Sequence, residues 1–409
     1  MKATYHNPTP QNARNRARLT SAAVCAMIAL SACGKPSTAV TLPPGVAPDG
    51  VLTPSVLNEA HMAIDRGLDW LAAHQKPDGS WSDGNFPALT ALPLWAFLRG
   101  DHPDKETVVS NAVAYILSCR QDDGGIYRTI EGRKGGGLSN YNTAICITAL
   151  NDVGDPSLIP VILKARKFLA DSQYLGDDHF HGGMGYDAPT KRAYTDLLNT
   201  YYAAEAMRLT QHLEDVRPEA EGRADLDWKA AAAFASRLQN RAGSGPDHDG
   251  GFVYNPVDPK AGASTNADGV VTFRSYGSIT YAGMMTLLYA EVAPNDARVK
   301  SAVSWATRHW TLEENPGLGQ MGIYFFYNIM AKCLSAYGID SIHASTGKID
   351  WRKDIVNKLI ELQVHEADTG HAYWVNPHGK YMEGDKILTT AYSLLVLEIA
   401  AHQSGGDDD

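Results

Sequence analysis

The chain has 409 residues, with 46 acidic and 36 basic side chains and a formal net charge of −10 at neutral pH. Its lysines and arginines are scattered, and a nucleic-acid partner would require a basic face, so the composition predicts no nucleic-acid binding. Once the two termini are set aside, roughly 350 residues remain, which is long for one ordinary core unless the chain is built from repeats.

The first 33 residues have the pattern of an export signal. Basic residues between Lys2 and Arg18 precede a mostly apolar stretch over 19–30, which has the length of a signal h-region and is too short to span a bilayer as a mature helix. The stretch ends in Leu30-Ser31-Ala32-Cys33, which resembles the bacterial lipobox. That resemblance implies an exported protein of the cell envelope, anchored to a membrane by lipid on Cys33. Ordinary signal cleavage is the alternative.

Residues 34–54 are rich in proline and are predicted to form an extended spacer. A folded domain is expected over 55–403, followed by a frayed acidic tail over 404–409. The domain contains three cysteines, Cys119, Cys146 and Cys333. Their odd number and wide spacing predict buried thiols rather than a disulfide framework, although a bridge between Cys119 and Cys146 stays open.

A pattern of two predicted helices around a Gly-rich turn recurs six times along the domain. The first helix of each unit is amphipathic, as over 63–73, and five units end it with a glutamine (Gln75, Gln121, Gln173, Gln239 and Gln363). The second helix is apolar on most sides and is therefore expected to be buried, with the amphipathic helices outside it. Strand signals are weak, and turn-flanked segments such as "GGFVYN" over 250–255 are expected to pair only briefly, so the sequence predicts an all-α protein.

The segment "WLAAHQKPDGSW" over 70–81 resembles the Gln–Trp repeat of terpenoid cyclases. The helical pairs resemble the wider superfamily of protein prenyltransferases and squalene–hopene cyclases, whose repeat is also found in squalene oxidases. The resemblance covers about residues 54–402 and implies an α6/α6 toroid, a barrel of six helical hairpins with inner and outer rings. The glutamine and the aromatic residue are then interpreted as a structural staple between an outer helix and a turn.

If every Gly-rich turn feeds an inner helix in the same sense, all the inner-helix N-termini face one mouth of the ring, which favours acceptor-rich ligands. Polar and aromatic residues predicted to bind a ligand there are Asn85, Tyr141, Asn142, Asn199, Tyr201, Ser278, Tyr281, Tyr324, Tyr327, Asn328 and Lys332. Helix capping is the alternative role for the short polar residues. Lys332 is expected either to snorkel to the surface or to pair with Glu383 or Asp385 across the ring.

Few of the catalytic and metal-binding residues known in this superfamily have a counterpart in this sequence. Proton-initiated squalene cyclases carry Asp-x-Asp-Asp-Thr-Ala at the start of an inner helix, whereas the matching segment over 139–144 reads "SNYNTA". An amide cannot donate the proton that this reaction needs. The third unit keeps only Asp196. The aspartate-rich and Asp-x-Cys metal motifs of the other relatives are missing too, so we predict no metal and no cofactor and interpret the clusters over 177–181 and 247–249 as solvated turns.

The sequence is compatible with two functions, a binding protein and an enzyme. The favoured hypothesis is a binding protein that holds a glycan, a peptide or a membrane-derived lipid in the toroid cavity. The alternative is an enzyme of the same architecture, either an isoprenoid cyclase or transferase or an enzyme that cleaves a polysaccharide by acid–base catalysis. In that case Asp196 would act with Glu383 or Asp385 as the catalytic pair.

Overall fold

The computed structural model describes residues 50–132, 137–188, 194–245, 247–265, 269–344 and 347–402. The predicted signal segment with Cys33, most of the Pro-rich spacer and the acidic tail lie outside these ranges. Within the described ranges, no helix combines the length and the apolar character that crossing a membrane requires.

Most of the described chain is helical, as predicted. Six helices are buried on most sides: α3 (Ala88–Arg99), α5 (Ser139–Val153), α7 (Leu197–Leu209), α9 (Gly277–Tyr289), α11 (Ile323–Ala336) and α13 (Lys386–Ala401). Six others are amphipathic: α2 (Pro54–Ala73), α4 (Lys105–Ser118), α6 (Ile159–Asp171), α8 (Trp228–Arg237), α10 (Ala297–Arg308) and α12 (Trp351–Leu362). Short 3-10 helices lie between them: η1 (Pro156–Leu158), η2 (Gln211–Val216), η3 (Glu219–Glu221) and η4 (Lys380–Met382).

The all-α prediction omits three small antiparallel hairpins. They pair β1 (Ala263–Thr265) with β2 (Val271–Phe273), β3 (Ile342–Ala344) with β4 (Gly347–Ile349), and β5 (Val364–His365) with β6 (Ala372–Tyr373). The strands have at most three residues each, too few for an alternating pattern to stand out in the sequence. The brief pairing expected within 250–255 is present as a bridge between Gln239 and Phe252.

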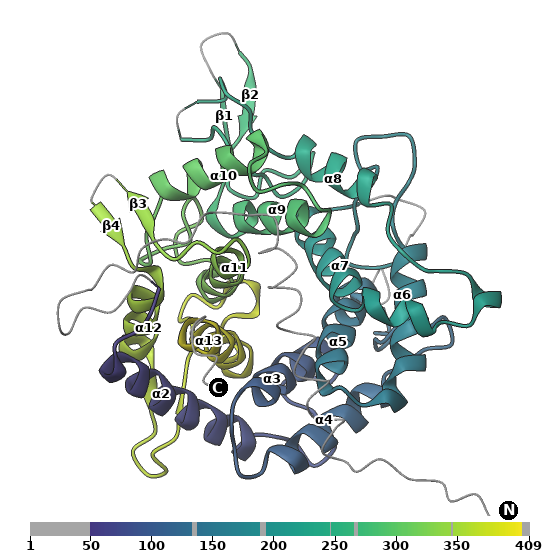
Figure 1. Cartoon of the computed structure of the whole chain (residues 1–409), viewed down its shortest axis with the longest axis vertical. Coiled ribbons are helices and arrows are strands. Elements are labelled where there is room, and N and C mark those ends of the chain that lie inside the picture. Colours follow the sequence, from purple (N-terminus) through teal and green to yellow (C-terminus); the bar gives the residue numbers. More distant parts are fainter. Residues whose placement is uncertain are drawn as a thin grey trace, which may run out of the picture.

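The buried helices close into a ring (Figure 1). Each packs against the next in chain order, from α3 to α13, and α13 then packs against α3. The amphipathic helices lie outside this ring, where α12 contacts both α13 and α2. Closure covers the apolar sides that an open row of helices would leave exposed at its two ends.

All six buried helices begin at one rim of the ring, as the sequence analysis expects. Hydrogen bonds join each helix start to the neighbouring helix start or to the segment that precedes it, and we call this end the N-terminal rim. The donor and acceptor residues are Ala88 and Asn142, Ser139 and Asp187, Leu197 and Tyr254, Ser278 and Asn315, Phe325 and Glu383, and Ser82 and Asp385.

Four of the five recurring glutamines join one outer helix to the next, whereas Gln121 donates to Cys119 O and Tyr127 O of its own turn. The amide nitrogen of Gln75 donates to Gly79 O in its own turn at 3.1 Å and to Val108 O in α4 at 3.0 Å. Gln173 and Gln239 make the same pair of bonds to their own turns and to the next outer helix or its cap, and Gln363 donates to Ala63 O of α2. The last of these links the end of the outer ring to its beginning, which supports the interpretation of the motif as a structural staple.

The glycine of the turn allows this close approach to the next outer helix. Gly182 has φ +89°, and a Cβ atom at this position would lie 2.1 Å from Ala230 O in α8. Gly79 repeats the arrangement, with φ +86° and a Cβ position 2.2 Å from Asn111 O in α4. Glycine is required at such positions because it alone combines the left-handed backbone with contact to a neighbouring main chain.

Cys119, Cys146 and Cys333 are buried free thiols. The expectation of buried thiols is therefore confirmed, and the bridge between Cys119 and Cys146 is not formed in this structure.

Candidate functional site

Asp196 caps the start of α7 and is fully buried. Its Oδ1 accepts the Asn199 N–H at 2.8 Å, and its Oδ2 accepts the Asn199 side-chain amide at 2.7 Å. Burial raises the pKa of this carboxyl to about 6, although the bonds from Asn199 and Tyr254 oppose the shift. The amine of Lys260 lies over the Tyr254 ring, 3.6 Å from its centroid. A carboxyl with this pKa exchanges a proton near neutral pH.

Glu383 and Asp385 also bind backbone amides. Glu383 is buried, and its Oε1 accepts the Phe325 N–H at 2.8 Å at the start of α11, where Gly322 offers no side-chain cap. Asp385 caps α13 by accepting the Ile387 N–H at 2.8 Å and also accepts a bond from Ser82 Oγ. The three predicted catalytic acids therefore all occupy helix starts at the N-terminal rim, where the helix dipole stabilises a negative charge.

Two predicted ligand residues at this rim, Asn142 and Ser278, hold loops and helices together, and a third, Asn85, makes a local bond. Asn142 accepts the Ala88 N–H at 3.0 Å and donates to two carbonyls of its preceding turn. Ser278 donates its N–H to Asn315 Oδ1 and accepts from the Asn315 amide. Asn85 is exposed in the turn before α3 and donates its N–H to Asp83. The bond from Ala88 to Asn142 agrees with the capping alternative, whereas the backbone N–H groups of Ser278 and Asn85 are themselves held by the side chains of Asn315 and Asp83.

Aromatic side chains from four helices of the ring meet in its interior. Tyr141 of α5 packs edge-on against Tyr202 of α7, with ring centroids 5.2 Å apart. Tyr202 also contacts Phe325 of α11, and its hydroxyl lies 3.4 Å from that of Tyr392 in α13. Since α7 and α13 stand three positions apart in a ring of six helices, this contact crosses the ring. We call Tyr141, Tyr202, Phe325 and Tyr392 the central aromatic cluster.

The tyrosines of α9 and of early α11 form a second aromatic group. Tyr281 packs near Phe326, and Tyr324 meets Tyr327 edge-on. The Tyr324 hydroxyl donates to Val375 O at 3.4 Å, and the Tyr327 hydroxyl donates to a loop carbonyl before α11 at 2.5 Å. These two hydroxyls therefore position connecting segments of the chain.

Lys332 forms a buried ion pair deeper in the ring, but with an acid that the sequence analysis did not select. Its amine lies 3.0 Å from Glu205 Oε1 of α7 and 4.2 Å from the centroid of the Trp95 ring in α3. Glu205 also accepts bonds from Tyr201 at 3.0 Å and from Tyr289 at 3.3 Å. The expected pairing of Lys332 with Glu383 or Asp385 is wrong, because those two acids lie at the N-terminal rim. The surface-snorkelling alternative is wrong as well, because the Lys332 side chain is buried. Burial lowers the pKa of Lys332, and Glu205 opposes that shift.

Two predicted amides keep buried polar atoms without a hydrogen-bond partner within the described ranges. They are Asn199 Oδ1 in α7 and Asn328 Nδ2 in α11. A buried amide group without a partner is unfavourable by about 1–3 kcal/mol. Such atoms are therefore suited to a ligand that carries its own hydrogen-bonding groups.

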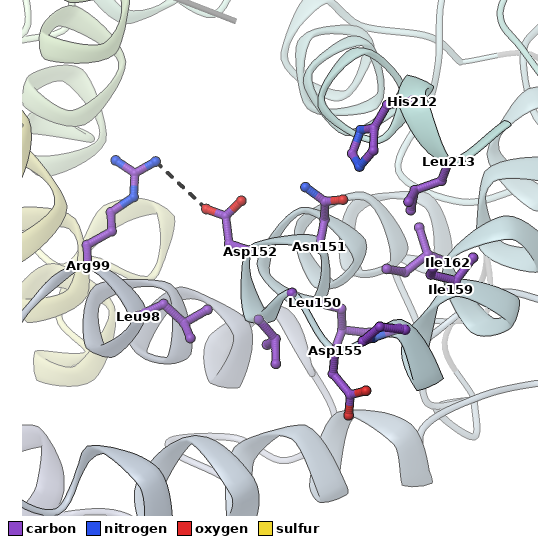
Figure 2. Close-up of a pocket in the computed structure, with 13 residues that line it drawn as sticks. Leu98, Arg99, Leu150, Asn151, Asp152, Asp155, Ile159, Ile162, His212 and Leu213 are labelled. Atoms are coloured by element: carbon purple, nitrogen blue, oxygen red, sulfur yellow. Dashed lines mark ion pairs between the residues drawn. The ribbon is translucent and has the colours of Figure 1, made fainter. Parts of the chain in front are cut away.

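A pocket of about 340 Å³ lies at the opposite end of the ring, at the C-terminal ends of α3 and α5 (Figure 2). Arg99, Asp152, Asn151 and His212 follow one edge of it, and apolar side chains of Leu98, Leu150, Ile159, Ile162 and Leu213 form its walls. Arg99 Nη2 lies 3.9 Å from Asp152 Oδ2. The prediction of a site at the N-terminal mouth did not include these residues.

The acidic cluster over 177–181, which the sequence analysis interprets as a solvated turn, contains ordinary turn hydrogen bonds. Asp178 accepts from Phe180 N and from the Tyr174 hydroxyl, and His181 contacts Gly176 O. A search of the described part of the chain finds no cluster of three or more His, Cys, Asp or Glu side chains able to hold a metal ion.

The solved structures that resemble this chain include two of the type II terpene cyclase MstE from Scytonema. One is a complex with geranylgeranyl dihydroxybenzoate, its substrate, and it matches with a TM-score of 0.50 and 14% identity. The other is an apo form, with a TM-score of 0.51 and 13% identity. Each match covers 86% of this chain and 99% of MstE. The fold resembles that of a type II terpene cyclase. No protein-family model matches the sequence, and no curated protein matches it.

Within this cyclase-like ring, the sequence analysis missed most of the interior residues. Trp95, Glu205, Tyr202 and Tyr392 were not selected, although each lies in a helix that is otherwise largely apolar. A lone charge in such a helix must find a partner inside the protein. The same rule that singles out Lys332 in the sequence also singles out Glu205, the other half of the pair.

Proposed function

We propose that this protein is an exported, lipid-anchored α6/α6 toroid of six helical hairpins that binds a ligand inside the ring and lacks squalene-cyclase chemistry. The lipobox-like segment ending at Cys33 motivates the anchor. The closed ring and the likeness to MstE support the architecture. Replacing Cys33 with alanine is expected to release the protein from the membrane fraction, as measured by immunoblotting. An unchanged distribution would contradict the anchor without affecting the binding proposal.

The observation that carries the binding proposal is the use of the three rim carboxylates as caps. Asp196, Glu383 and Asp385 each accept backbone N–H groups at a helix start. At the position of the cyclase acid motif, Asn140 donates its amide to the carbonyls of Gly185 and Asp187, so it serves to hold a neighbouring segment. The acids that remain thus have structural roles.

The central aromatic cluster and the unpartnered amides indicate what the ring could hold. Aromatic faces bind apolar surfaces and sugar or peptide groups through contact area, and Asn199 and Asn328 add hydrogen-bonding atoms. A glycan, a peptide or a membrane-derived lipid fits this combination. All three are accessible to an exported protein.

The test is native mass spectrometry of the full chain extracted in mild detergent, followed by identification of any released molecule. Tyr392→Phe removes the hydroxyl that faces Tyr202 and is expected to lower ligand occupancy. Tyr337→Phe is the matched control, because its hydroxyl donates to Met284 O at 2.9 Å, away from the central aromatic cluster. Conversion of an isoprenoid substrate into a cyclised product by the purified protein would contradict the proposal.

A second candidate function is an enzyme that uses Asp196 as an acid, as a cyclase-like enzyme or in the cleavage of a polysaccharide. The raised pKa of about 6 for this buried carboxyl favours it, since a general acid works best when its pKa lies near the working pH. Asp196→Asn keeps a capping side chain and should abolish turnover while leaving the helix content unchanged. Turnover that survives this substitution excludes Asp196 as the acid.

A further inference from the structure

The pocket at the C-terminal ends of α3 and α5 contains two opposite charges that are too far apart for a close ion pair. The guanidinium of Arg99 approaches Asp152 only to 3.9 Å, and their side chains are 32% and 20% exposed. Arg99 also stacks on Trp95, with its Cζ atom 4.8 Å from the ring centroid. A close bidentate pair between arginine and carboxylate would have its atoms about 2.7–2.9 Å apart. Both groups therefore retain hydrogen-bonding capacity toward the pocket.

The groups around Asp152 do not fully offset the burial of its carboxyl. Its Oδ2 accepts a bond from Trp95 Nε1 at 2.5 Å. Burial raises the pKa of this carboxyl, and neither Arg99 nor Trp95 fully offsets the shift. The last carbonyl groups of α3 and α5 add partial negative charge at this end of the ring. A cationic group beside Asp152 would thus be favoured, while Arg99 is placed to receive an anionic group.

The remaining walls set the size and character of a ligand. A volume of about 340 Å³ lies near the lower end of the range of about 300–1,000 Å³ that is typical of small-molecule pockets. Leu98, Leu150 and Ile159 are among the apolar residues that face it, whereas Arg99, Asn151, Asp152 and His212 lie along one edge and Asp155 lies apart from them (Figure 2). A ligand that matches has both charges at one end and an apolar body at the other.

We propose that this pocket binds a small zwitterion of the α-amino-acid type with an apolar side chain. The ammonium group would lie against Asp152, the carboxylate against Arg99, and the side chain against the apolar wall. In an α-amino acid the nitrogen and the carboxyl carbon are about 2.5 Å apart, as set by the N–Cα and Cα–C bonds. That spacing lets one molecule lie alongside two protein charges whose atoms are 3.9 Å apart. The site lies at the C-terminal end of the ring, where Trp95 contacts Arg99, Asp152 and the interior Lys332, and the proposal does not depend on the function proposed above.

The experiment compares L-leucine with two analogues that each lack one charge, isopentylamine and 4-methylpentanoate. Binding to the full chain in mild detergent is measured by isothermal titration calorimetry at fixed ionic strength. Each additional charge-assisted contact should strengthen binding, so L-leucine is expected to bind about tenfold more tightly than either analogue. Equal affinity of L-leucine and one analogue, or no binding of L-leucine, would overturn the proposal.

Variants assign each charge to its partner. Arg99→Met should remove the advantage of L-leucine over isopentylamine, and Asp152→Asn should remove its advantage over 4-methylpentanoate. Asp155→Asn is the matched control, because Asp155 lines the same pocket, caps η1 by accepting the Ser157 N–H at 2.8 Å, and points away from the polar edge (Figure 2). Circular dichroism confirms that each variant is folded. If Asp155→Asn changes the selectivity as much as Asp152→Asn does, the proposed geometry is refuted.

Discussion

Removing one member of the buried pair formed by Lys332 and Glu205 is expected to destabilise the ring strongly. The two side chains are 9% and 5% exposed, and their charged atoms are 3.0 Å apart. Glu205→Gln would leave the Lys332 amine buried against the face of Trp95 with no anion beside it. Lys332→Met would leave Glu205 with the hydroxyls of Tyr201 and Tyr289 as its donors among the described residues.

The magnitude follows from the burial of both partners. Breaking a buried ion pair by removing one member costs about 3–5 kcal/mol, whereas replacing both members costs much less. Each single variant should therefore lose about 3–5 kcal/mol in the free energy of unfolding. The double variant should lose less than the sum of the two, with a coupling energy of about 2 kcal/mol or more. An exposed pair provides the comparison: Lys167→Met removes the partner of Asp171, whose atoms lie 2.7 Å away, and should cost about 0.3–0.5 kcal/mol.

The assay is equilibrium urea unfolding of the full chain, followed by tryptophan fluorescence, for the wild type, both single variants, the double variant and Lys167→Met. Additive costs for Glu205→Gln and Lys332→Met would refute the reasoning, because additivity means that the two groups do not interact. Single-variant costs as small as that of the exposed pair would refute it as well.

Three further predictions concern the rim, the staple and the turns. Burial raises the folded-state pKa of Asp196 from 3.8 to about 6, so the stability that comes from its bound proton is present below pH 3.8 and lost as the pH rises through 6. In urea titrations at several pH values, the wild type should therefore lose up to about 3 kcal/mol more than Asp196→Asn between acidic and neutral pH, and parallel curves would contradict this. Gln363→Ala removes the bond to Ala63 O at 2.9 Å and should lower the free energy of unfolding by about 1–2 kcal/mol. Amide hydrogen exchange should become faster in α2 and α12 alone, and unchanged exchange there would argue against a staple. Gly182→Ala should prevent or severely weaken folding. Gly222→Ala, at φ +66° with nothing within 4 Å of its Cβ position, should lower the free energy of unfolding by only about 1–2 kcal/mol. Equal thermal stability of the two variants would count against the proposed close contact.

The repeats were predictable because their chemistry is local. A glutamine at a helix end and an aromatic residue after a Gly-rich turn recur with similar spacing, and their partners lie in the same or the next unit. Trp81 Nε1 donates to Leu71 O at 2.8 Å, and Trp374 Nε1 donates to Leu359 O at 2.7 Å, so the same aromatic contact occurs in the first and last units. Such patterns survive loop insertions, because the insertions leave the helix end and its turn unchanged.

The partner of Lys332 was not predictable by the same reasoning, because it depends on depth along the ring axis. Lys332 is nine residues into α11, which begins at Ile323, and Glu205 is eight residues into α7, which begins at Leu197. At about 1.5 Å per residue, both lie about 12–14 Å from the N-terminal rim. Glu383 and Asp385 precede α13 and remain at the rim. Measuring depth from each helix start would have excluded them as partners.

The two ends of the ring use their charges differently, and helix polarity explains why. At the N-terminal rim, Asp196, Glu383 and Asp385 are held by backbone amides. A ligand that took over one of these carboxylates would uncap a helix, at a cost of about 1 kcal/mol. At the other end, Arg99 and Asp152 lie 3.9 Å apart, are partly exposed and stand at the C-terminal ends of α3 and α5, so a ligand there would not uncap a helix. The free-energy cost of binding a charged ligand is therefore lower at the C-terminal pocket than at the N-terminal rim. A ligand in the ring interior must be held mainly by the central aromatic cluster. It follows that substitutions of Tyr202 or Tyr392 and substitutions of Arg99 or Asp152 should affect different ligands.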